Sequence, residues 1–470
     1  MNPGRLEQIR GGNDMEGERA GRALRVAMLA VHSSPVGELG TQDTGGMSVY
    51  VREVARELGR MGHRVDIFTR LSEPGHVAPR RLYENVRLVQ LPAGIHGPVH
   101  KLALYPHLEE FCREILRFCR AEGLSYDLLQ SHYWLSGLVG ARLKRVWRIP
   151  HFVVFHTLGA LKNSTDEPQK EPPIRLRAER RLAATCDRVL ASTQEEKTFL
   201  TLHLAADPER ISVVPCGVDL ELFQPVNKTE ARRRLGFDPQ DILILFVGRF
   251  APLKGINRLI ASLSYLKSLD RVRLVVAGGN GSKEEGPLRR GNEALRDELR
   301  GLILFPGRIE QSRLPLYYSA ADLLVLPSQY ESFGLVALEA LACGTPVVAT
   351  PVGAMPTLIR QGETGCLVPD GSPESLARGI ETALACCRGR PPEAIRASVL
   401  SFGWRQTVSG LLADLTALRR SPNAVGGSSP ARGKPPHTLS RACSLPLRLC
   451  PGGAPCGTPA AYENPAEGTP

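Results

Sequence analysis

The sequence has no continuous apolar run that approaches the ~20 residues needed for a membrane-spanning helix. Its first residues, MNPGRLEQIRGGNDMEGERAGRA, also lack the apolar core of a signal peptide. The eleven cysteines form no CxxC pair, and no HExxH or DxD stretch offers a carboxylate-rich metal site. We therefore expect a cytoplasmic protein with reduced thiols, no transmembrane segment and no metal held by side chains.

The chain also lacks a long basic run, although its formal net charge is +11. Residues 421–470 hold four basic against two acidic side chains, so most of the excess lies in the folded part. There it forms Arg-rich helical faces such as RLRAERR, which are usually solvated. This distribution argues against a nucleic-acid partner and favours small anionic ligands.

What the sequence does contain is a regular alternation of short β-rich runs and amphipathic stretches, typical of buried parallel strands with crossover helices. The predicted strands are RVAMLAVH, RVDIFT, VRLVQL, DLLQSH, HFVVFHT, RVLAST and ISVVP, then ILILFVG, RLVVAG, LILF, LLVLP, PVVAT and CLVP. A turn-rich segment, 215–230, separates the two groups. Because single cores stop growing at roughly 250–300 residues, we expect an α/β protein with two successive doubly wound, Rossmann-like domains facing a central cleft.

The predicted boundaries follow from this pattern. They are a disordered N-terminal extension (1–23), a first Rossmann-like domain (24–222), a second Rossmann-like domain (223–404), a C-terminal helix (405–420), and a disordered tail rich in Pro, Gly and Ser (421–470). The ligand assignments of the two domains depend on the motifs below.

The stretch GGMSVYVREVARELGRMG between the first two strands predicts an amphipathic helix that begins at Gly45–Gly46. Its inward face carries Tyr50, Val51, Val54, Ala55, Leu58 and Met61, and its outward face Arg52, Glu53, Arg56, Glu57 and Arg60. A diglycine lets backbone amides approach a ligand, although alone it is more often a tight turn.

FVGRFAPLKG places Arg249 and Lys254 just after a predicted strand, with Gly255 opening a helix. Ligands of open α/β sheets collect at the carboxyl ends of strands, and two cations there can neutralise a diphosphate. Alone, an RxxxxK pair is more often two surface charges, but the strand and glycine context favours a pyrophosphate cradle.

ESFGLVALEALACG sets Glu331 and Glu339 eight positions apart. If a helix begins near Ser332 or Phe333, the amides of Phe333, Gly334 and Leu335 are free donors, and Gly334 permits close approach. Carboxylates accept hydroxyls well, so Glu331 would bind a sugar and Glu339 a ribose diol. The alternative is a helix-end charge and a solvated face, but Glu339 lies between Leu338 and Ala340, where an unpaired carboxylate is costly.

Several of these stretches carry a family resemblance: DTGGMSVYVREVARELGRMGHRVDIFTR, VPCGVD, FVGRFAPLKG, ADLLVLPSQYESFGLVALEALACGTPVVATPVGAMPTLI and GETGCLVPDG. Over roughly Arg25 to Arg420 the chain resembles the retaining glycosyltransferases of the GT-B fold, the group-1 superfamily. AVHSSP, QSHYWLSG, FHTLGALKN and IRLRAER look most like the branch that glycosylates an inositol phosphate, with the sucrose-phosphate synthases as close relatives.

The resemblance implies that residues 24–222 form an acceptor-binding domain, that residues 223–404 form a nucleotide-sugar-binding domain, and that the helix at 405–420 packs back toward the first. It also implies roles for individual positions. Catalysis would involve Gly46, His156, Arg249 and Lys254, and the donor would contact Gly46, Arg249, Lys254, Ile309, Glu331, Phe333, Gly334, Leu335 and Glu339. The acceptor would contact His32, Asp43, Thr44, Gly45, Gly46, Met47, Ser48, Lys101, Tyr133, Thr157 and Arg175, with Lys101, Tyr133, Thr157 and Arg175 on its phosphate. Two departures from the branch are Ser48 in place of Asn, and ELG at 38–40 in place of Gln-Pro-Gly.

The activity implied is transfer of GlcNAc or glucose from a UDP-sugar to a phosphorylated polyol, with retained anomeric configuration and no required cofactor. The branch can bind a structural magnesium ion through backbone carbonyls, here near Tyr318 and Ser319. The alternatives are a sucrose-phosphate synthase-like enzyme, a polysaccharide or lipid-glycan glycosyltransferase, and a nucleotide-sugar-binding regulatory protein without turnover. A homodimer and peripheral membrane contact stay open.

Overall fold

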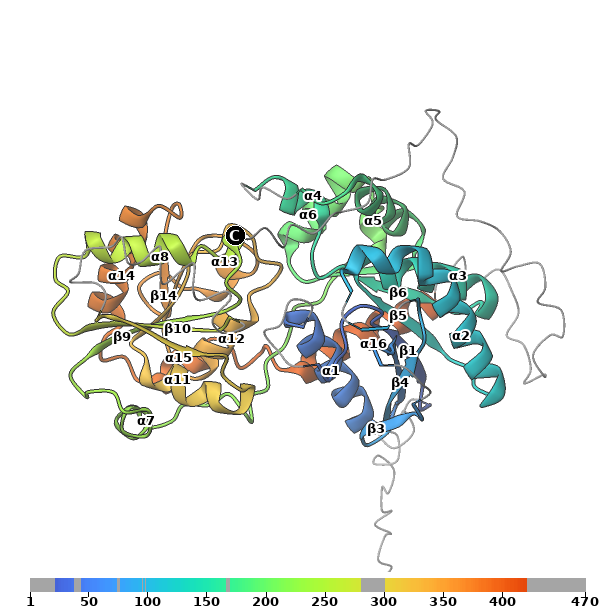
Figure 1. Ribbon diagram of the computed structural model, residues 1–470, viewed down its shortest axis with the longest axis horizontal. Helices are drawn as coiled ribbons and strands as arrows, with labels where there is room; N and C mark the ends of the chain where they lie inside the picture. The colour runs from blue at the N-terminus through green and yellow to red at the C-terminus, as the bar shows by residue number, and fades with distance from the viewer. Residues whose placement is uncertain are drawn as a thin grey trace, which may run out of the picture. The chain divides into compact units, whose positions relative to one another are not determined.

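Two parallel sheets, one after the other along the chain, organise the structure (Figure 1). The computed structural model describes residues 22–37, 44–73, 77–94, 96–97, 99–165, 170–279 and 301–420. The first sheet contains β1 (Arg25–Leu29), β2 (Arg64–Arg70), β3 (Arg80–Tyr83), β4 (Val86–Leu91), β5 (Leu128–His132), β6 (His151–Val154), β7 (Arg188–Ala191) and β8 (Ile211–Val213). The second contains β9 (Ile242–Val247), β10 (Val272–Ala277), β11 (Ile303–Gly307), β12 (Leu323–Leu326), β13 (Val347–Ala349) and β14 (Gly365–Leu367).

The helices follow the strands as crossover connections. Those of the first sheet are α1 (Gly46–Arg60), α2 (Leu108–Ala121), α3 (Tyr133–Trp147), α4 (Gly159–Asn163), α5 (Pro173–Thr185) and α6 (Gln194–Leu204). After them come α7 (Lys228–Leu235), α8 (Ile256–Ser262), α11 (Leu314–Ala320), α12 (Leu335–Ala342), α13 (Met355–Leu358), α14 (Pro373–Cys387), α15 (Pro392–Ala397) and α16 (Trp404–Arg420). None of the helices in the described ranges is both long and apolar enough to span a membrane.

The strand order locates the ligand edge of each sheet. The second sheet runs β11-β10-β9-β12-β13-β14, which is the doubly wound order, and its direction of winding reverses between β9 and β12. The first sheet runs β3-β4-β2-β1-β5-β6-β7-β8 and reverses between β1 and β5. The predicted fold class, two doubly wound Rossmann-like sheets, is therefore confirmed. Ligands of such sheets bind beyond the carboxyl ends of the strands at the reversal.

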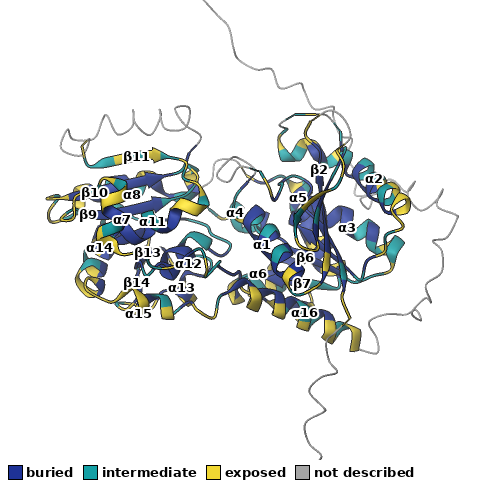
Figure 2. Ribbon diagram, turned by 90° about the horizontal axis from the view of Figure 1, so that it is seen from below, coloured by how far each residue is buried: buried dark blue, intermediate teal, exposed yellow. Residues whose placement is uncertain are grey.

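The strands are almost continuously apolar because successive side chains point to opposite faces of the sheet and both faces are buried. Val26 and Met28 of β1 pack in one hydrophobic cluster, whereas Ala27 and Leu29 pack in another on the opposite face. Both faces of each sheet are covered by helices, so both sets of side chains are buried. Figure 2 shows this as sheets coloured mainly as buried, with the exposed residues on the outer sides of helices such as α16.

All thirteen predicted strands are present, and one further strand of the described residues was missed. β3, with the sequence RRLY, pairs antiparallel with β4 at the edge of the first sheet. Its two arginines are exposed, so it has no apolar run that the sequence pattern could reveal. The predicted domain boundary after residue 222 falls between β8 and α7, in the segment that joins the sheets.

The outward face predicted for α1 was wrong in part. Glu53 and Glu57 are buried rather than solvated. Arg56 forms an ion pair with Asp219 at 2.7 Å, because the segment between the two sheets lies along this side of the helix. The inward face is as predicted, with Tyr50, Val54 and Leu58 buried.

The C-terminal helix α16 packs against elements of the first sheet. Asp414 accepts a hydrogen bond of 2.6 Å from Ser212 of β8, and Trp404 makes an edge contact with Tyr50 of α1. The predicted tail (421–470) and residues 1–21 of the predicted extension lie outside the described residues.

Candidate active site

The donor side of the predicted site lies at the reversal of the second sheet. Arg249 is exposed two residues after β9, and Lys254 ends a short 3₁₀ helix that follows it. Glu331 lies beyond the end of β12, the strand beside β9. The Lys254 ammonium is 2.5 Å from Glu331 Oε1, which also accepts a hydrogen bond of 2.9 Å from Ser328. The structure thus brings a cation of the first motif together with a carboxylate of the second.

The start of α12 differs from the prediction. The helix begins at Leu335 rather than near Ser332, because Gly334 has φ of 102°, a left-handed conformation that favours glycine. A Cβ at Gly334 would lie 2.3 Å from the Met355 methyl carbon, a contact that movement of this flexible side chain could relieve, so the preference for glycine comes from the backbone conformation. The amides of Phe333 and Gly334 therefore belong to the turn before the helix.

The N-termini of two helices meet at this point. α1 begins at Gly46, as predicted, and a Cβ placed on Gly46 would lie 3.6 Å from the Leu335 side chain at the start of α12. Gly45 is the N-cap of α1, and no atom lies within 4 Å of a Cβ placed there. Free amides and the helix dipoles make such a place favourable for an anion.

Glu339 is buried on α12, and its carboxylate accepts a hydrogen bond of 2.8 Å from the Tyr318 hydroxyl. Burial raises the pKa of Glu339 to about 7, and hydrogen bonds from Tyr318 and Gln311 and the nearby Arg52 cation offset this only in part. The expected solvated alternative is therefore wrong: the carboxylate is partnered and desolvated.

A cavity of about 250 Å³ adjoins Glu339. Its lining includes Val49 and Arg52 of α1, Gln311, Leu335 and Glu339 of the second sheet's connections, and Trp404 of α16. Arg52 donates to the Gln311 side chain, so it joins α1 to the second sheet beside Glu339. The prediction placed Arg52 on a solvated face and did not select Gln311, and no signal in either stretch of sequence indicates this contact.

Three histidines gather at the carboxyl ends of β1, β5 and β6. His132 Nδ1 and His156 Nε2 are 2.9 Å apart, and the His32 ring lies 4.5 Å from the Tyr133 ring. Burial lowers the pKa of His32 and of His156 to about 3 and that of His132 well below its usual value, so all three are neutral at pH 7. His156 and Tyr133 also have positive φ, 59° and 74°, and such strained conformations cluster at functional sites.

The four residues predicted to hold an acceptor phosphate converge. Arg175 on α5 is fully buried, and its guanidinium donates to the Thr157 carbonyl at 2.7 Å and hydroxyl at 2.9 Å. The Arg175 guanidinium lies 4.8 Å from the centre of the Tyr133 ring, and the Lys101 ammonium lies 5.9 Å from the same ring centre. Four residues far apart in the sequence therefore form one cationic cluster.

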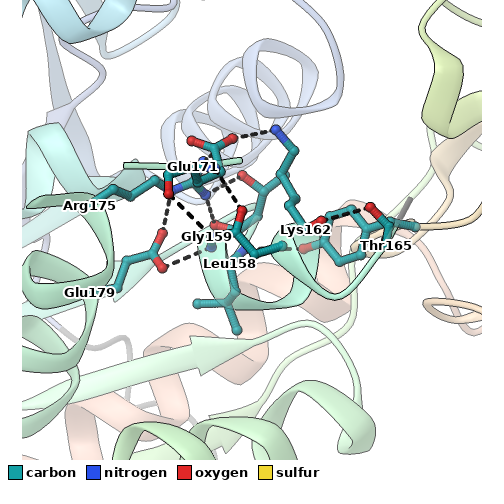
Figure 3. A network of polar contacts seen from close by, with 10 residues as sticks. Leu158, Gly159, Lys162, Thr165, Glu171, Arg175 and Glu179 are labelled. Atoms are coloured by element: carbon teal, nitrogen blue, oxygen red, sulfur yellow. Dashed lines mark hydrogen bonds and ion pairs between the residues drawn. The ribbon is translucent and has the colours of Figure 1, made fainter. Parts of the chain in front are cut away.

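Two carboxylates and a lysine that sequence reasoning missed complete this cluster (Figure 3). Arg175 donates to Glu179 at 2.6 Å and pairs with Glu171 at 2.8 Å, while Lys162 pairs with the same Glu171 oxygen. Glu179 also accepts from the Gly159 amide at 2.9 Å. Arg175 and Glu179 are i, i+4 on α5, a signal for ion pairs along a helix that could have identified Glu179, whereas Glu171 lies before the helix.

The remaining predicted positions lie around α1 and β11. Ser48 is buried, with its hydroxyl 2.7 Å from that of Ser33, and Thr44 is also buried. Met47 is partly buried against both hydrophobic clusters of the first sheet. Ile309 follows β11 and is partly buried, and Asp43 lies outside the described residues, as does the ELG stretch at 38–40.

Hydrogen bonds join the residues after β12 to the acceptor side. The Leu158 amide donates to the Tyr330 hydroxyl at 3.0 Å, and the Ser192 hydroxyl donates to the Ser332 carbonyl at 3.2 Å. The Ser332 hydroxyl donates to the His156 carbonyl. The loop that carries Glu331 is therefore tied to the segment that carries His156 and Thr157.

The carbonyl of Tyr318 does not fit the magnesium role considered above. It accepts hydrogen bonds from the Thr345 hydroxyl at 2.6 Å and from the Ala321 amide at 3.1 Å, so both of its lone pairs are used. The Ser319 hydroxyl accepts from the Val226 amide. Within the described ranges, no group of three or more His, Cys, Asp or Glu side chains could hold a metal.

Comparison with known families identifies both halves of the chain. Residues 227–393 match the family "Glycosyl transferases group 1", and residues 44–222 match "Glycosyltransferase Family 4". The D-inositol 3-phosphate glycosyltransferase of Corynebacterium glutamicum (strain R) is 40% identical over 402 residues, which cover 83% of this chain and 95% of that protein.

Solved structures show the same architecture. Sucrose-phosphate synthase from Thermosynechococcus elongatus is similar with a TM-score of 0.72 and 30% identity, covering 84% of this chain and 98% of that one. Anabaena Alr3699/HepE in complex with UDP and glucose is similar with a TM-score of 0.65 and 20% identity, covering 84% and 100% of the two chains. The latter likeness bears on the fold alone.

Proposed function

The chain belongs to the group 1 glycosyltransferases of the GT-B fold, and on that premise we propose that it moves a hexosyl group from a UDP-sugar to an inositol phosphate with retained configuration. One observation carries the acceptor assignment: Lys101, Tyr133, Thr157 and Arg175 converge at the edge where β5 and β6 end. The name of the corynebacterial relative, with 40% identity over most of both chains, supports the same acceptor.

On the donor side, Arg249 and Lys254 are proposed to bind the diphosphate, with the facing ends of α1 and α12 supplying amides. Glu331 is proposed to bind sugar hydroxyls and Glu339 the ribose diol. The cavity beside Glu339 supports this assignment, since it opens next to the carboxylate and is bordered by both α1 and α12. Because a carboxylate accepts hydroxyls and repels phosphate, the four side chains divide the donor between them.

The proposed reaction needs no nucleophilic side chain. The bond from the anomeric carbon to the β-phosphate oxygen breaks, the acceptor hydroxyl oxygen bonds to that carbon from the same face, and its proton passes to the leaving phosphate. Negative charge grows on the diphosphate as the bond breaks, and Arg249 and Lys254 would stabilise it. His156 would lie beside the developing positive charge of the sugar as a neutral ring, since burial holds its pKa at about 3.

This chemistry differs from that of a glycosidase, in which two carboxylates flank the scissile bond. Glu331 is paired with Lys254 and Glu339 with Tyr318, so both carboxylates are committed to partners on the donor side. Contacts such as the Tyr330 hydroxyl with the Leu158 amide would help to keep water from the reacting groups when substrates are bound.

The test is a panel of UDP-GlcNAc, UDP-glucose and their ADP and GDP analogues, crossed with inositol 3-phosphate, free inositol and fructose 6-phosphate. Products are detected by mass spectrometry, and proton NMR assigns the anomeric configuration. We expect a product from a UDP-sugar with inositol 3-phosphate and an α configuration matching the donor. Product formation that favours free inositol would overturn the acceptor, and a β-linked product would overturn retention.

A second acceptor is favoured by one specific observation. The sucrose-phosphate synthase from Thermosynechococcus elongatus combines 30% identity with coverage of nearly its whole chain. Fructose 6-phosphate is therefore the alternative, and it uses the same phosphate cluster. A catalytic efficiency higher with fructose 6-phosphate than with inositol 3-phosphate would establish it.

A further inference from the structure

Glu171 occupies the position in the cationic cluster where an acceptor phosphate oxygen would be expected. One of its oxygens contacts both the Lys162 ammonium and Nη1 of Arg175. A lysine and an arginine sharing one anionic oxygen is the arrangement that proteins use for phosphate. Without substrate, the cluster thus holds an anion that belongs to the protein itself (Figure 3).

The two carboxylates of the cluster differ in how firmly they are held. Glu179 is fully buried and is fixed by the Gly159 amide and by Arg175 Nε. Glu171 retains 8% side-chain exposure, and its carboxylate contacts the two cations named above. Glu179 is therefore the permanent counterion of Arg175, and Glu171 is the more exposed of the two carboxylates.

The backbone at Glu171 is anchored independently of its side chain. The Asn163 side chain accepts from the Glu171 amide at 2.6 Å and donates to the Glu171 carbonyl at 3.2 Å, and Pro172 follows directly. A proline restricts the residue before it, so the main chain is doubly constrained. Moving the carboxylate away from Arg175 needs only a rotation of the side chain.

Charge balance decides whether Glu171 can stay when phosphate arrives. Lys101, Lys162 and Arg175 face Glu171 and Glu179, an excess of one positive charge. A phosphate monoester brings about −1.5 to −2 charges at pH 7. With Glu171 in place the incoming anion meets a like charge on the same two cations, whereas without it the cluster offers two unbalanced positive charges.

We infer that Glu171 is a built-in counterion which the acceptor phosphate displaces from Lys162 and Arg175, and that this exchange selects phosphorylated over neutral polyols. The inference rests on the proposed function, since it concerns the same acceptor cluster. A neutral polyol has no charge with which to replace the carboxylate, so it leaves the cluster closed. Lys162 then becomes a further phosphate ligand, and Glu171 is a specificity residue rather than a catalytic one.

The test measures binding of inositol 3-phosphate, inorganic phosphate and free inositol to the full-length protein by calorimetry. Glu171→Gln removes the competing charge and keeps the shape, so the Kd for inositol 3-phosphate should fall by at least roughly two- to fivefold, the effect of a single ion pair. Affinity for free inositol should not change. In steady-state assays the acceptor KM should fall while the donor KM stays constant.

Matched variants separate exchange from a purely structural role. Lys162→Met should weaken inositol 3-phosphate binding. Lys170→Met removes the same charge from a neighbouring exposed lysine that donates to the Asn163 and Thr165 carbonyls, and this variant should bind like the wild type. If Glu171 merely positions Arg175, Glu171→Gln weakens binding, and that result, or an unchanged Kd, overturns the inference.

A second measurement does not depend on the variant folding. A crystal structure of the wild type with inositol 3-phosphate should show the Glu171 carboxylate out of contact with Arg175 Nη1; a retained contact overturns the exchange. If the wild type transfers sugar to inositol 3-phosphate and Glu171→Gln changes neither the Kd nor the acceptor KM, only the exchange is refuted. Absence of phosphate binding by every form would refute both the exchange and the proposed acceptor.

Discussion

Glu339 gives the sharpest test of the donor site, because its environment makes opposite predictions for stability and for binding. Its carboxylate is buried against Tyr318, and burial raises its pKa from 4.5 to about 7. The substitution Glu339→Gln keeps the size of the side chain and an oxygen that accepts from the Tyr318 hydroxyl. It removes the charge and replaces one carboxylate oxygen with an NH2 group.

The stability effect follows from the sign of the shift. Between pH 4.5 and 7 the folded protein holds a proton on Glu339 that the unfolded chain has lost, so the wild type is destabilised as pH rises through this window. A shift of this size corresponds to about 3 kcal/mol. Glu339→Gln should therefore be close to the wild type in stability at pH 4.5 and more stable by up to about 3 kcal/mol at pH 8.

The binding effect has the opposite sign. In the proposed role of Glu339, a ribose diol would be held by hydrogen bonds to the ionised carboxylate, each contributing about 1.5 to 3 kcal/mol. Loss of one such bond would raise the donor KM by roughly 10- to 100-fold at pH 8. In the wild type the donor KM should rise as pH falls below 7, since the ionised fraction of Glu339 decreases, and in Glu339→Gln it should be flat across this range.

Urea denaturation of substrate-free protein from pH 5 to 8, with donor KM measured over the same range, tests both effects. The Tyr318→Phe variant is a control, because it removes the hydroxyl and leaves the charge. Parallel stability profiles for wild type and Glu339→Gln would refute the raised pKa. An unchanged donor KM in Glu339→Gln at pH 8 would refute the ribose role.

Three further predictions concern neighbouring contacts. Lys254→Met should lower kcat about 100- to 1,000-fold, because it removes charge stabilisation of the leaving group. It should destabilise the protein by no more than about 1 kcal/mol, since the ion pair with Glu331 is partly exposed. A loss of folding stability as large as the loss of transition-state stabilisation would contradict a transition-state role. Gly46→Ala should fold normally, because the added Cβ makes only an ordinary contact of 3.6 Å with Leu335. It should raise the donor KM by filling the space between α1 and α12. Gly45→Ala, whose Cβ has no atom within 4 Å, should have the smaller effect on donor KM. Tyr330→Phe leaves the Leu158 amide without its partner and should cost about 1 to 3 kcal/mol in urea denaturation, with a rise in acceptor KM because Thr157 is adjacent; no change in either would show that the contact is not maintained in solution.

Much of the fold could be predicted because the strands are buried on both faces and are therefore recognisable as short apolar runs. β1, β9 and β12 follow this rule, and the residues that end them determine the ligand edge. β3 could not be predicted, because an exposed edge strand of sequence RRLY has neither an apolar run nor a clear alternation. The polar face of α1 was mistaken for a solvated one, since nothing local indicates that Asp219 lies against it.

The candidate site divides in the same way. Lys254 and Glu331 could be placed together from sequence because each follows a strand, and parallel strands end at one edge. Gln311 and Lys162 could not, because each reaches its partner from a connection whose path depends on packing elsewhere. The late start of α12 is a local effect, but it depends on the left-handed conformation of Gly334, which sequence permits without requiring.

Both halves of the site share one electrostatic device. On the donor side Lys254 is paired with Glu331, and on the acceptor side Arg175 and Lys162 are paired with Glu171. In each pair the cation is proposed to bind phosphate, and the carboxylate prevents an unbalanced positive charge from being held in a partly desolvated site, which would be costly. The carboxylates then have different fates: Glu331 can turn to the sugar hydroxyls when diphosphate takes Lys254, whereas Glu171 has no hydroxyl assigned to it and must yield its cations outright. Removing the Glu171 carboxylate should therefore tighten binding of the acceptor, and removing the Glu331 carboxylate should weaken binding of the donor.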